Sequence, residues 1–259
     1  MRCFYLDIDA NNTPHPGDRV FLDADQTKHL RMVTRASVGD ELVLTDGHGH
    51  ELEGVLIGGD KRQAEVEIKS VQVAVAEARA PRLHLACAVV KGKRFEYAVE
   101  KAVELGAHVI TPLKTERGVI DPRDGKQDRW RGMLVTAIKQ CGRCWLPELQ
   151  PVRDLLTIMD QATGPVFFGA APGDLIAEQI QTPAAAAAQA ARRRLDGQAV
   201  PEELTLVIGP EGGWTVAELQ LLSVRDAIPL SLGPHVLRTE TAATVGLAAI
   251  QGVRRSWLG

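Results

Sequence analysis

The sequence has few cysteines, no long apolar run and little net charge, and each shortage excludes a class of protein. Four cysteines in 259 residues are too few and too scattered for a secreted domain held by disulfides. No stretch reaches the roughly 18 apolar residues of a membrane helix, and the first residues lack the features of a secretory signal. A net charge of −3 disfavours unspecific coating of nucleic acid. We therefore expect a soluble, cytoplasmic protein without a membrane partner.

The charges that are present are unevenly distributed along the chain. Residues 1–77 carry 8 Lys and Arg against 14 Asp and Glu, whereas the rest carries 22 against 19. Basic residues gather at 91–94, 123–131 and 192–194. We interpret the last cluster as a solvated helix face. For the first two clusters, a solvated helix face and an RNA-facing surface are equally good interpretations.

The first 75 residues are typical of a small β-rich domain. Short apolar or alternating segments predict strands at 19–22, 41–44, 51–57 and 64–71. A short helix is expected over 26–34. This pattern suits a small barrel, and residues 76–81 have the composition of a linker.

From residue 76 to 259 the pattern alternates between strands and helices. Apolar runs predict strands at 83–90, 109–110, 166–169, 204–208 and 227–232. Helical spacing predicts helices at 95–105, 128–141, 215–224 and 238–253, and alanine content predicts a surface helix at 183–195. The alternation indicates an α/β domain with a mainly parallel sheet covered by helices on both faces.

Two strand–turn–helix segments near the end of the chain are the most informative. Strand 204–208 runs into the turn 209–213, and Thr215 with Glu218 then matches a capping box. Strand 227–232 runs into a second Gly-Pro turn followed by Arg, Thr and Glu. Loops beyond the carboxyl ends of strands bind ligands in open α/β sheets, so we expect two walls of one pocket. A tight structural turn is the alternative. Neither loop matches the dinucleotide or phosphate-loop patterns.

These two segments resemble the paired signatures of the RsmE family, the ribosomal small-subunit RNA (uracil-N3)-methyltransferases. The matching residues are Ile208 to Trp214 and Leu232 to Ala242, with further similarity at 91–106, 115–117, 140–147, 1–4 and 29–40. The resemblance therefore covers nearly the whole chain. The chain departs from the family pattern at Cys141 and Cys144, where small hydroxyl residues are common, and at Gly118, where serine is common.

The resemblance implies a fold, a cofactor and partners. It implies a PUA-like β-barrel at 1–75 and a SPOUT methyltransferase domain at 76–259 with a C-terminal trefoil knot, a rare feature that rests on the resemblance alone. It also implies a homodimer that uses S-adenosylmethionine (SAM), without a metal, to methylate N3 of a uridine in 16S ribosomal RNA of the small ribosomal subunit.

The chemistry assigns roles to residues of the second segment. Methyl transfer to N3 needs an aligned methyl donor and removal of the N3 proton. We expect Arg238 to stabilise negative charge on the uracil oxygens and Glu240 to accept the proton. An ion pair or a cap at the helix start is the alternative for both residues. His235 is interpreted as a loop residue.

The remaining candidate site residues fall into two groups. The cofactor group comprises Gly209, Pro210, Glu211, Gly212, Gly213, Leu232, Gly233, Leu237, Thr239, Thr241 and Ala242. The RNA-binding group comprises Arg2, Arg31, Lys91, Lys93, Arg94, Arg117 and Arg143. For Arg117 and Arg143, a surface salt bridge is an equally good interpretation.

Three alternatives stay open at this point. The same fold could act on transfer RNA or on the large subunit, or the chain could be a non-catalytic assembly factor that has kept the pocket.

Cys141 and Cys144 have the spacing of a redox motif. No second cysteine pair or nearby histidine completes a zinc site, so we interpret them as small buried residues at a helix end.

Overall fold

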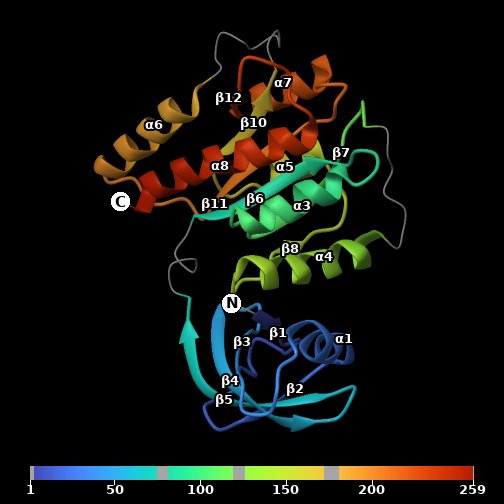
Figure 1. Cartoon of the computed structure of the whole chain (residues 1–259). Coiled ribbons are helices and arrows are strands. Elements are labelled where there is room, and N and C mark those ends of the chain that lie inside the picture. The colour runs from blue at the N-terminus through green and yellow to red at the C-terminus, as the bar shows by residue number, and fades with distance from the viewer. Residues whose placement is uncertain (1–2, 75–80, 119–125, 172–180, 259) are drawn as a thin grey trace. The chain divides into compact units, whose positions relative to one another are not determined.

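A computed structural model describes residues 3–74, 81–118, 126–171 and 181–258 of the chain (Figure 1). The chain divides into two compact units. The first comprises Met1–Arg79 and Val135–Leu146, and the second comprises Ala80–Leu134 and Pro147–Gly259. Each unit has its own sheet and its own apolar core, so each is described by itself.

The first unit is built on a five-stranded sheet with the strand order β1-β3-β4-β5-β2. The pair β1 and β3 is parallel and the other pairs are antiparallel. Side chains alternate along β4 and β5 because successive residues of a strand point to opposite faces. The strands are β1 (Cys3–Tyr5), β2 (Arg19–Leu22), β3 (Glu41–Thr45), β4 (His50–Gly59) and β5 (Ala64–Val73). The four predicted strands are confirmed, whereas β1 is too short to carry a pattern.

The helix predicted over 26–34 divides into two pieces. Helix α1 (Ala24–His29) begins at Asp23, whose side chain accepts a hydrogen bond from the backbone N–H of Gln26. A π-helical turn, η1 (Leu30–Thr34), continues it and ends where Arg35 adopts a left-handed conformation with φ of 52°. Fully buried Leu30 ties this turn to the core of the unit.

Residues Val135–Leu146 belong to the first unit although they lie far along the chain. The backbone N–H of Gly49 donates to the carbonyl of Cys144 (2.9 Å), and the N–H of Leu146 donates to the carbonyl of Gly47 (2.8 Å). The four cysteines form no disulfide among the described residues. Cys144 is buried as expected, whereas the expectation of a buried Cys141 was wrong, because this residue at the end of α4 is exposed. Within the described ranges, no group of His, Cys, Asp and Glu side chains is arranged to hold a metal ion.

Asp46 is a fully buried carboxylate at the centre of a turn in the first unit. It accepts hydrogen bonds from the backbone N–H groups of His48 (2.8 Å) and His50 (3.1 Å). The ring Nδ1 of His50 lies 2.6 Å from its other oxygen, and the Thr13 hydroxyl donates to the same oxygen over 3.3 Å. Substitution by alanine would leave these partly buried donors without an acceptor.

We therefore expect Asp46→Ala to lower the free energy of unfolding of the first unit by about 2–3 kcal/mol. Native-state hydrogen exchange of the β3 and β4 amides would measure this loss separately from the second unit. Asp60→Ala is the matched control, because exposed Asp60 also accepts from two backbone N–H groups, those of Arg62 and Gln63. Equal losses in the two variants would contradict a special role for the buried carboxylate.

The second unit contains a seven-stranded sheet with the order β12-β10-β11-β6-β7-β8, with β9 also paired to β7. Every pairing in it is parallel, which confirms the predicted sheet. The strands are β6 (Arg82–Ala88), β7 (Val109–Lys114), β8 (Glu148–Leu149), β9 (Arg153–Asp154), β10 (Val166–Ala170), β11 (Glu203–Ile208) and β12 (Ile228–Ser231). Strands β8 and β9 are two residues each, too short to predict.

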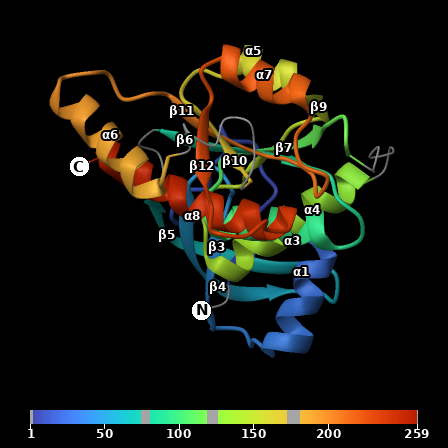
Figure 2. The same cartoon turned by 90° about the horizontal axis from the view of Figure 1, so that it is seen from above.

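Helices cover both faces of this sheet, as Figure 2 shows for α3 and α8 on one side and α5 and α7 on the other. The helices of this unit are α3 (Arg94–Glu104), α5 (Leu155–Gln161), α6 (Pro183–Leu195), α7 (Val216–Val224) and α8 (Thr239–Leu258). Helix α4 (Lys126–Cys141) begins in this unit, and its residues from Val135 onward belong to the first unit. Helix α5 was not predicted, since seven residues give little periodicity. Among the helices of the described ranges, none is both long and apolar enough to cross a membrane.

Local sequence signals explain where these helices begin and end. The predicted capping box is present, because Thr215 and Glu218 exchange side-chain and backbone hydrogen bonds at the start of α7. Gly106 follows α3 with φ of 80°, a left-handed conformation that glycine adopts readily. The alanine-rich helix α6 lies along α8, with Ala186 and Ala190 buried (Figure 1). The capping box fixes the start of α7, and the packing against α6 fixes α8. These are the two helices that follow the predicted loops.

Candidate active site

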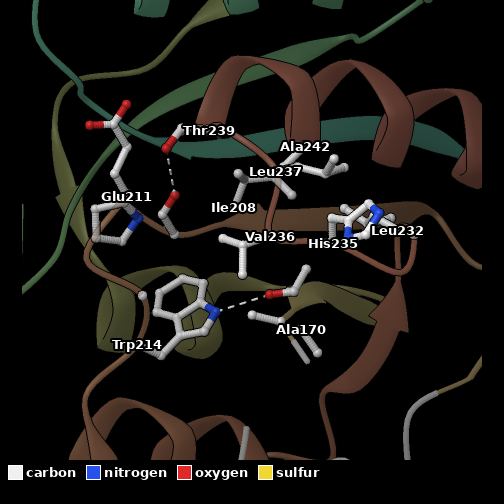
Figure 3. Close-up of a pocket in the computed structure, with 16 residues that line it drawn as sticks. Ala170, Ile208, Glu211, Trp214, Leu232, His235, Val236, Leu237, Thr239 and Ala242 are labelled. Atoms are coloured by element: carbon white, nitrogen blue, oxygen red, sulfur yellow. Dashed lines mark hydrogen bonds between the residues drawn. The ribbon is translucent and has the colours of Figure 1, made fainter. Parts of the chain in front are cut away.

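A pocket lies beyond the carboxyl ends of three neighbouring parallel strands, β10, β11 and β12. Its walls are the loop after β11, the loop after β12, the residues at the end of β10 and the first turn of α8 (Figure 3). These segments surround about 610 Å³ of space, part of it open to solvent. This is the edge of an open α/β sheet at which ligands bind.

The loop after β11 is held close to the sheet by Trp214. The indole N–H of this buried residue donates to the carbonyl of Gly169 at the end of β10 (3.1 Å). Gly209 has no room for a side chain, because a Cβ there would lie 2.9 Å from the Trp214 ring. A turn closed from the Gly213 N–H to the Pro210 carbonyl (3.0 Å) completes the loop, and Gly213 has φ of 69°. The glycines therefore serve close packing and a left-handed turn.

The loop after β12 closes against the first loop through Thr239. This buried hydroxyl donates to the carbonyl of Gly209 over 3.1 Å. Figure 3 shows Ile208, Leu237 and Ala242 on one side of the pocket and Trp214 with Ala170 on the other. The result is an apolar slot whose rim is made of backbone groups.

Two arginines hold the loop after β11 from outside the pocket. Arg94, at the start of α3, forms an ion pair with Glu211. Arg117, which follows β7, donates to the backbone carbonyls of Gly212 and Trp214. Both guanidinium groups, predicted to contact RNA, are thus engaged with the loop.

The structure brings most of the predicted cofactor residues together. Of the group defined from the sequence, all line the pocket except Gly212 and Thr241. The pocket residues that were not in the predicted cofactor group are Gly169, Ala170, Ala171, Ile208, Trp214, His235 and Val236. Residues 169–171 lie at the end of the predicted strand 166–169. The sequence could have predicted them as pocket residues if this strand had been placed beside the strand 204–208.

The two predicted catalytic residues lie at the start of α8, outside the pocket lining. Arg238 is exposed, and its guanidinium group pairs with no other residue that the structure describes. The Glu240 side chain is partly buried, and its Oε2 atom is buried without a hydrogen-bond partner in the described ranges. Burial, and then the nearby charge of Glu240, raises the pKa of the Cys87 thiol to about 12. Cys87 is therefore a neutral neighbour for the carboxylate.

The other predicted RNA-binding residues are dispersed. Arg2 lies outside the described residues. Lys91 and Lys93 are exposed just before α3. Arg31 belongs to the first unit and donates to the carbonyl of Gly59 over 3.0 Å. Arg143 is buried in the first unit. Apart from Arg94 and Arg117, which contact the loop after β11, the predicted RNA-binding residues that the structure describes as exposed are Lys91, Lys93 and Arg31.

An open parallel sheet with a glycine-rich pocket at the carboxyl ends of three adjacent strands, β12, β10 and β11, defines a ligand-binding α/β domain, here preceded by a β-rich unit. A model described as the RNA methyltransferase domain matches residues 77–251, and one described as the RNA methyltransferase PUA domain matches residues 22–69. The chain therefore belongs to the RNA methyltransferase family, within the group of the ribosomal RNA small subunit methyltransferase E proteins. The predicted resemblance, the PUA-like first domain and the enzyme class are thereby confirmed.

Individual relatives match over most of their length. The ribosomal RNA small subunit methyltransferase E of Synechocystis sp. is 30% identical, covering 92% of this chain and 74% of the relative. That of Mycobacterium tuberculosis is 30% identical, covering 98% and 92%. A solved Legionella pneumophila methyltransferase with bound SAM has a TM-score of 0.78 at 31% identity, covering 96% of each chain. The methyltransferase E of Neisseria gonorrhoeae, also bound to SAM, has a TM-score of 0.77 at 25% identity, covering 97% of each.

Proposed function

We propose that this protein transfers a methyl group from SAM to N3 of a uridine in 16S ribosomal RNA of the small ribosomal subunit. One observation carries the proposal. The two glycine-rich loops that the sequence singled out enclose a single pocket in a chain whose relatives are small-subunit RNA methyltransferases. Two of the similar solved structures hold SAM.

The pocket fits the chemistry of SAM. Its lining is mainly apolar with a few polar and backbone groups, as is typical of small-molecule sites. Ile208, Leu237 and Ala242 offer an apolar surface for the adenine ring, and the glycine-rich loops bring backbone groups within reach of the ribose. When bound, SAM supplies an electrophilic methyl group.

The residues at the start of α8 complete the reaction in this proposal. Arg238 follows Leu237 and precedes Thr239, both of which line the pocket, and its side chain is exposed. In this proposal its positive charge stabilises negative charge on the uracil oxygens as N3 loses its proton. Glu240 carries the buried oxygen without a partner, and we propose that this carboxylate accepts the N3 proton directly or through water.

The same proposal extends to the arrangement of the whole protein. We propose that residues 1–75 form the RNA-binding domain and that residues 76–259 form a SPOUT domain with a C-terminal trefoil knot. The resemblance of residues 208–214 and 232–242 to the paired RsmE signatures supports the SPOUT domain and its knot. We further propose a cytoplasmic homodimer, which light scattering would reveal as a particle with the mass of two chains.

Mapping the product tests the proposed activity directly. The protein is incubated with labelled SAM and small ribosomal subunits from cells that lack the modification, and the RNA is analysed by mass spectrometry. We expect one methyl group on N3 of one uridine. Methylation of a ribose hydroxyl or of another base would overturn the assignment.

Two control incubations separate the alternative functions. Transfer RNA and large subunits, offered under the same conditions, are expected to remain unmodified. Methylation of either would keep the enzyme class and change the substrate. Calorimetric titration that detects no binding of SAM or of its demethylated product would instead favour a non-catalytic assembly factor.

A further inference from the structure

Two backbone carbonyls of the loop after β11 converge on one nitrogen of Arg117. The Nη1 atom donates to the carbonyl of Gly212 over 2.9 Å and to that of Trp214 over 3.1 Å. The residue between them, Gly213, has φ of 69°. This left-handed turn brings the carbonyls on either side of Gly213 to the same side of the chain. A single guanidinium group can therefore bridge them.

The segment that carries Arg117 is itself fixed to the end of the same loop. The N–H of Glu116 donates to Oε1 of Glu218 over 3.0 Å. The other oxygen of this buried carboxylate accepts from the N–H of Thr215 over 2.8 Å. Glu218 thus joins the segment after β7 to the start of α7, which holds the Arg117 backbone in register with the loop.

The packing at Gly212 leaves little freedom between the two segments. A Cβ at Gly212 would lie 3.2 Å from the Cβ of Arg117, closer than ordinary van der Waals contact. Gly212 itself does not line the pocket, whereas its neighbours Gly213 and Trp214 do. Arg117 therefore contacts the outer side of a loop whose inner side faces the pocket.

We propose that Arg117 is a positioning residue for the cofactor, which acts through the backbone of residues 212–214 and does not contact the RNA. This inference rests on the proposed use of SAM. A loop with three glycines within five residues loses much conformational entropy when it is ordered. The two hydrogen bonds from Arg117 order it before the cofactor binds, which removes that cost from binding.

The test measures SAM affinity and RNA affinity separately in Arg117→Ala. We expect the Kd for SAM, measured by calorimetry, to rise about tenfold, which corresponds to the net contribution of about one hydrogen bond, because Arg117 is exposed and water can replace part of what the loop carbonyls lose. Hydrogen exchange of the peptide covering residues 209–215 is expected to become faster in the absence of SAM. The affinity for small subunits and its dependence on salt are expected to stay unchanged.

Two further variants distinguish positioning from a general loss of structure. Arg117→Lys keeps a long cationic donor, so we expect it to recover most of the SAM affinity. Arg225→Ala removes another arginine of the same unit, one that pairs with Asp160 over 2.6 Å away from the pocket lining. We expect the parent SAM affinity in that control.

The outcomes separate the inference from the proposed function. Parent SAM affinity in Arg117→Ala, together with weaker RNA binding and a shallower salt dependence, would overturn the inference and identify a phosphate contact. In that case the proposed function would still stand. If the parent protein itself bound no SAM, the proposed function would fail instead.

Discussion

Replacing Arg238 by alanine is expected to lower the turnover number by about 100- to 1,000-fold, the typical cost of removing one group that stabilises developing charge. The exposed guanidinium group pairs with no other described residue, so its removal breaks no hydrogen bond or ion pair within the described ranges. We therefore expect the unfolding temperature and the Kd for SAM to remain at their parent values. Single-turnover kinetics with saturating SAM and small subunits would measure the effect on the methyl-transfer step.

Arg255→Ala is the matched control for Arg238→Ala. Arg255 is also exposed and lies in the last turns of the same helix, α8. It is expected to retain parent turnover. Arg238→Lys keeps the charge and loses the planar fork of donors, so we expect an intermediate rate. Unchanged turnover in Arg238→Ala would remove this residue from the mechanism, and a raised KM with normal turnover would identify a contact that only binds RNA.

Long periodic segments and turn chemistry made most of the second unit predictable. The strand at 204–208, the capping box at Thr215 and the helix after Arg238 all appear where the sequence placed them, within a few residues. Each depends on local physics: an apolar run, a side chain that satisfies free N–H groups, and helical spacing. The pocket followed because both loops leave parallel strands at the same edge of the sheet.

The unpredicted features depend on contacts between distant segments. Nothing local assigns 135–146 to the first unit, because Cys144 and Leu146 form hydrogen bonds with Gly49 and Gly47, which lie nearly one hundred positions earlier. The short strands β8 and β9 exist only as partners of β7. Likewise, the sequence gives no sign that Arg94 and Arg117 contact the loop after β11. Their partners, Glu211 and the Gly212 carbonyl, lie about one hundred positions later in the chain.

The Glu240 carboxylate leads to the other large prediction. A buried carboxylate oxygen normally has a hydrogen-bond donor, and this one has none among the residues that the structure describes. A site with an unused acceptor suits a substrate that brings its own donor, and the N3–H group of uracil is such a donor. Glu240→Gln replaces a proton acceptor by an amide of nearly the same shape. We expect it to lower turnover by about 100- to 10,000-fold, the usual contribution of a general base.

The pH dependence of this variant gives the decisive readout. As pH rises, a growing fraction of the uracil imide loses its N3 proton to solvent, so less is gained from a base on the protein. We therefore expect the deficit of Glu240→Gln to shrink steadily with rising pH, whereas that of Arg238→Ala should persist. Glu104→Gln, which alters a surface carboxylate paired with Lys101 in the same unit, is expected to leave turnover unchanged. A Glu240→Gln deficit that stayed constant with pH, or accompanied a lower unfolding temperature, would show that the carboxylate supports structure and takes no proton.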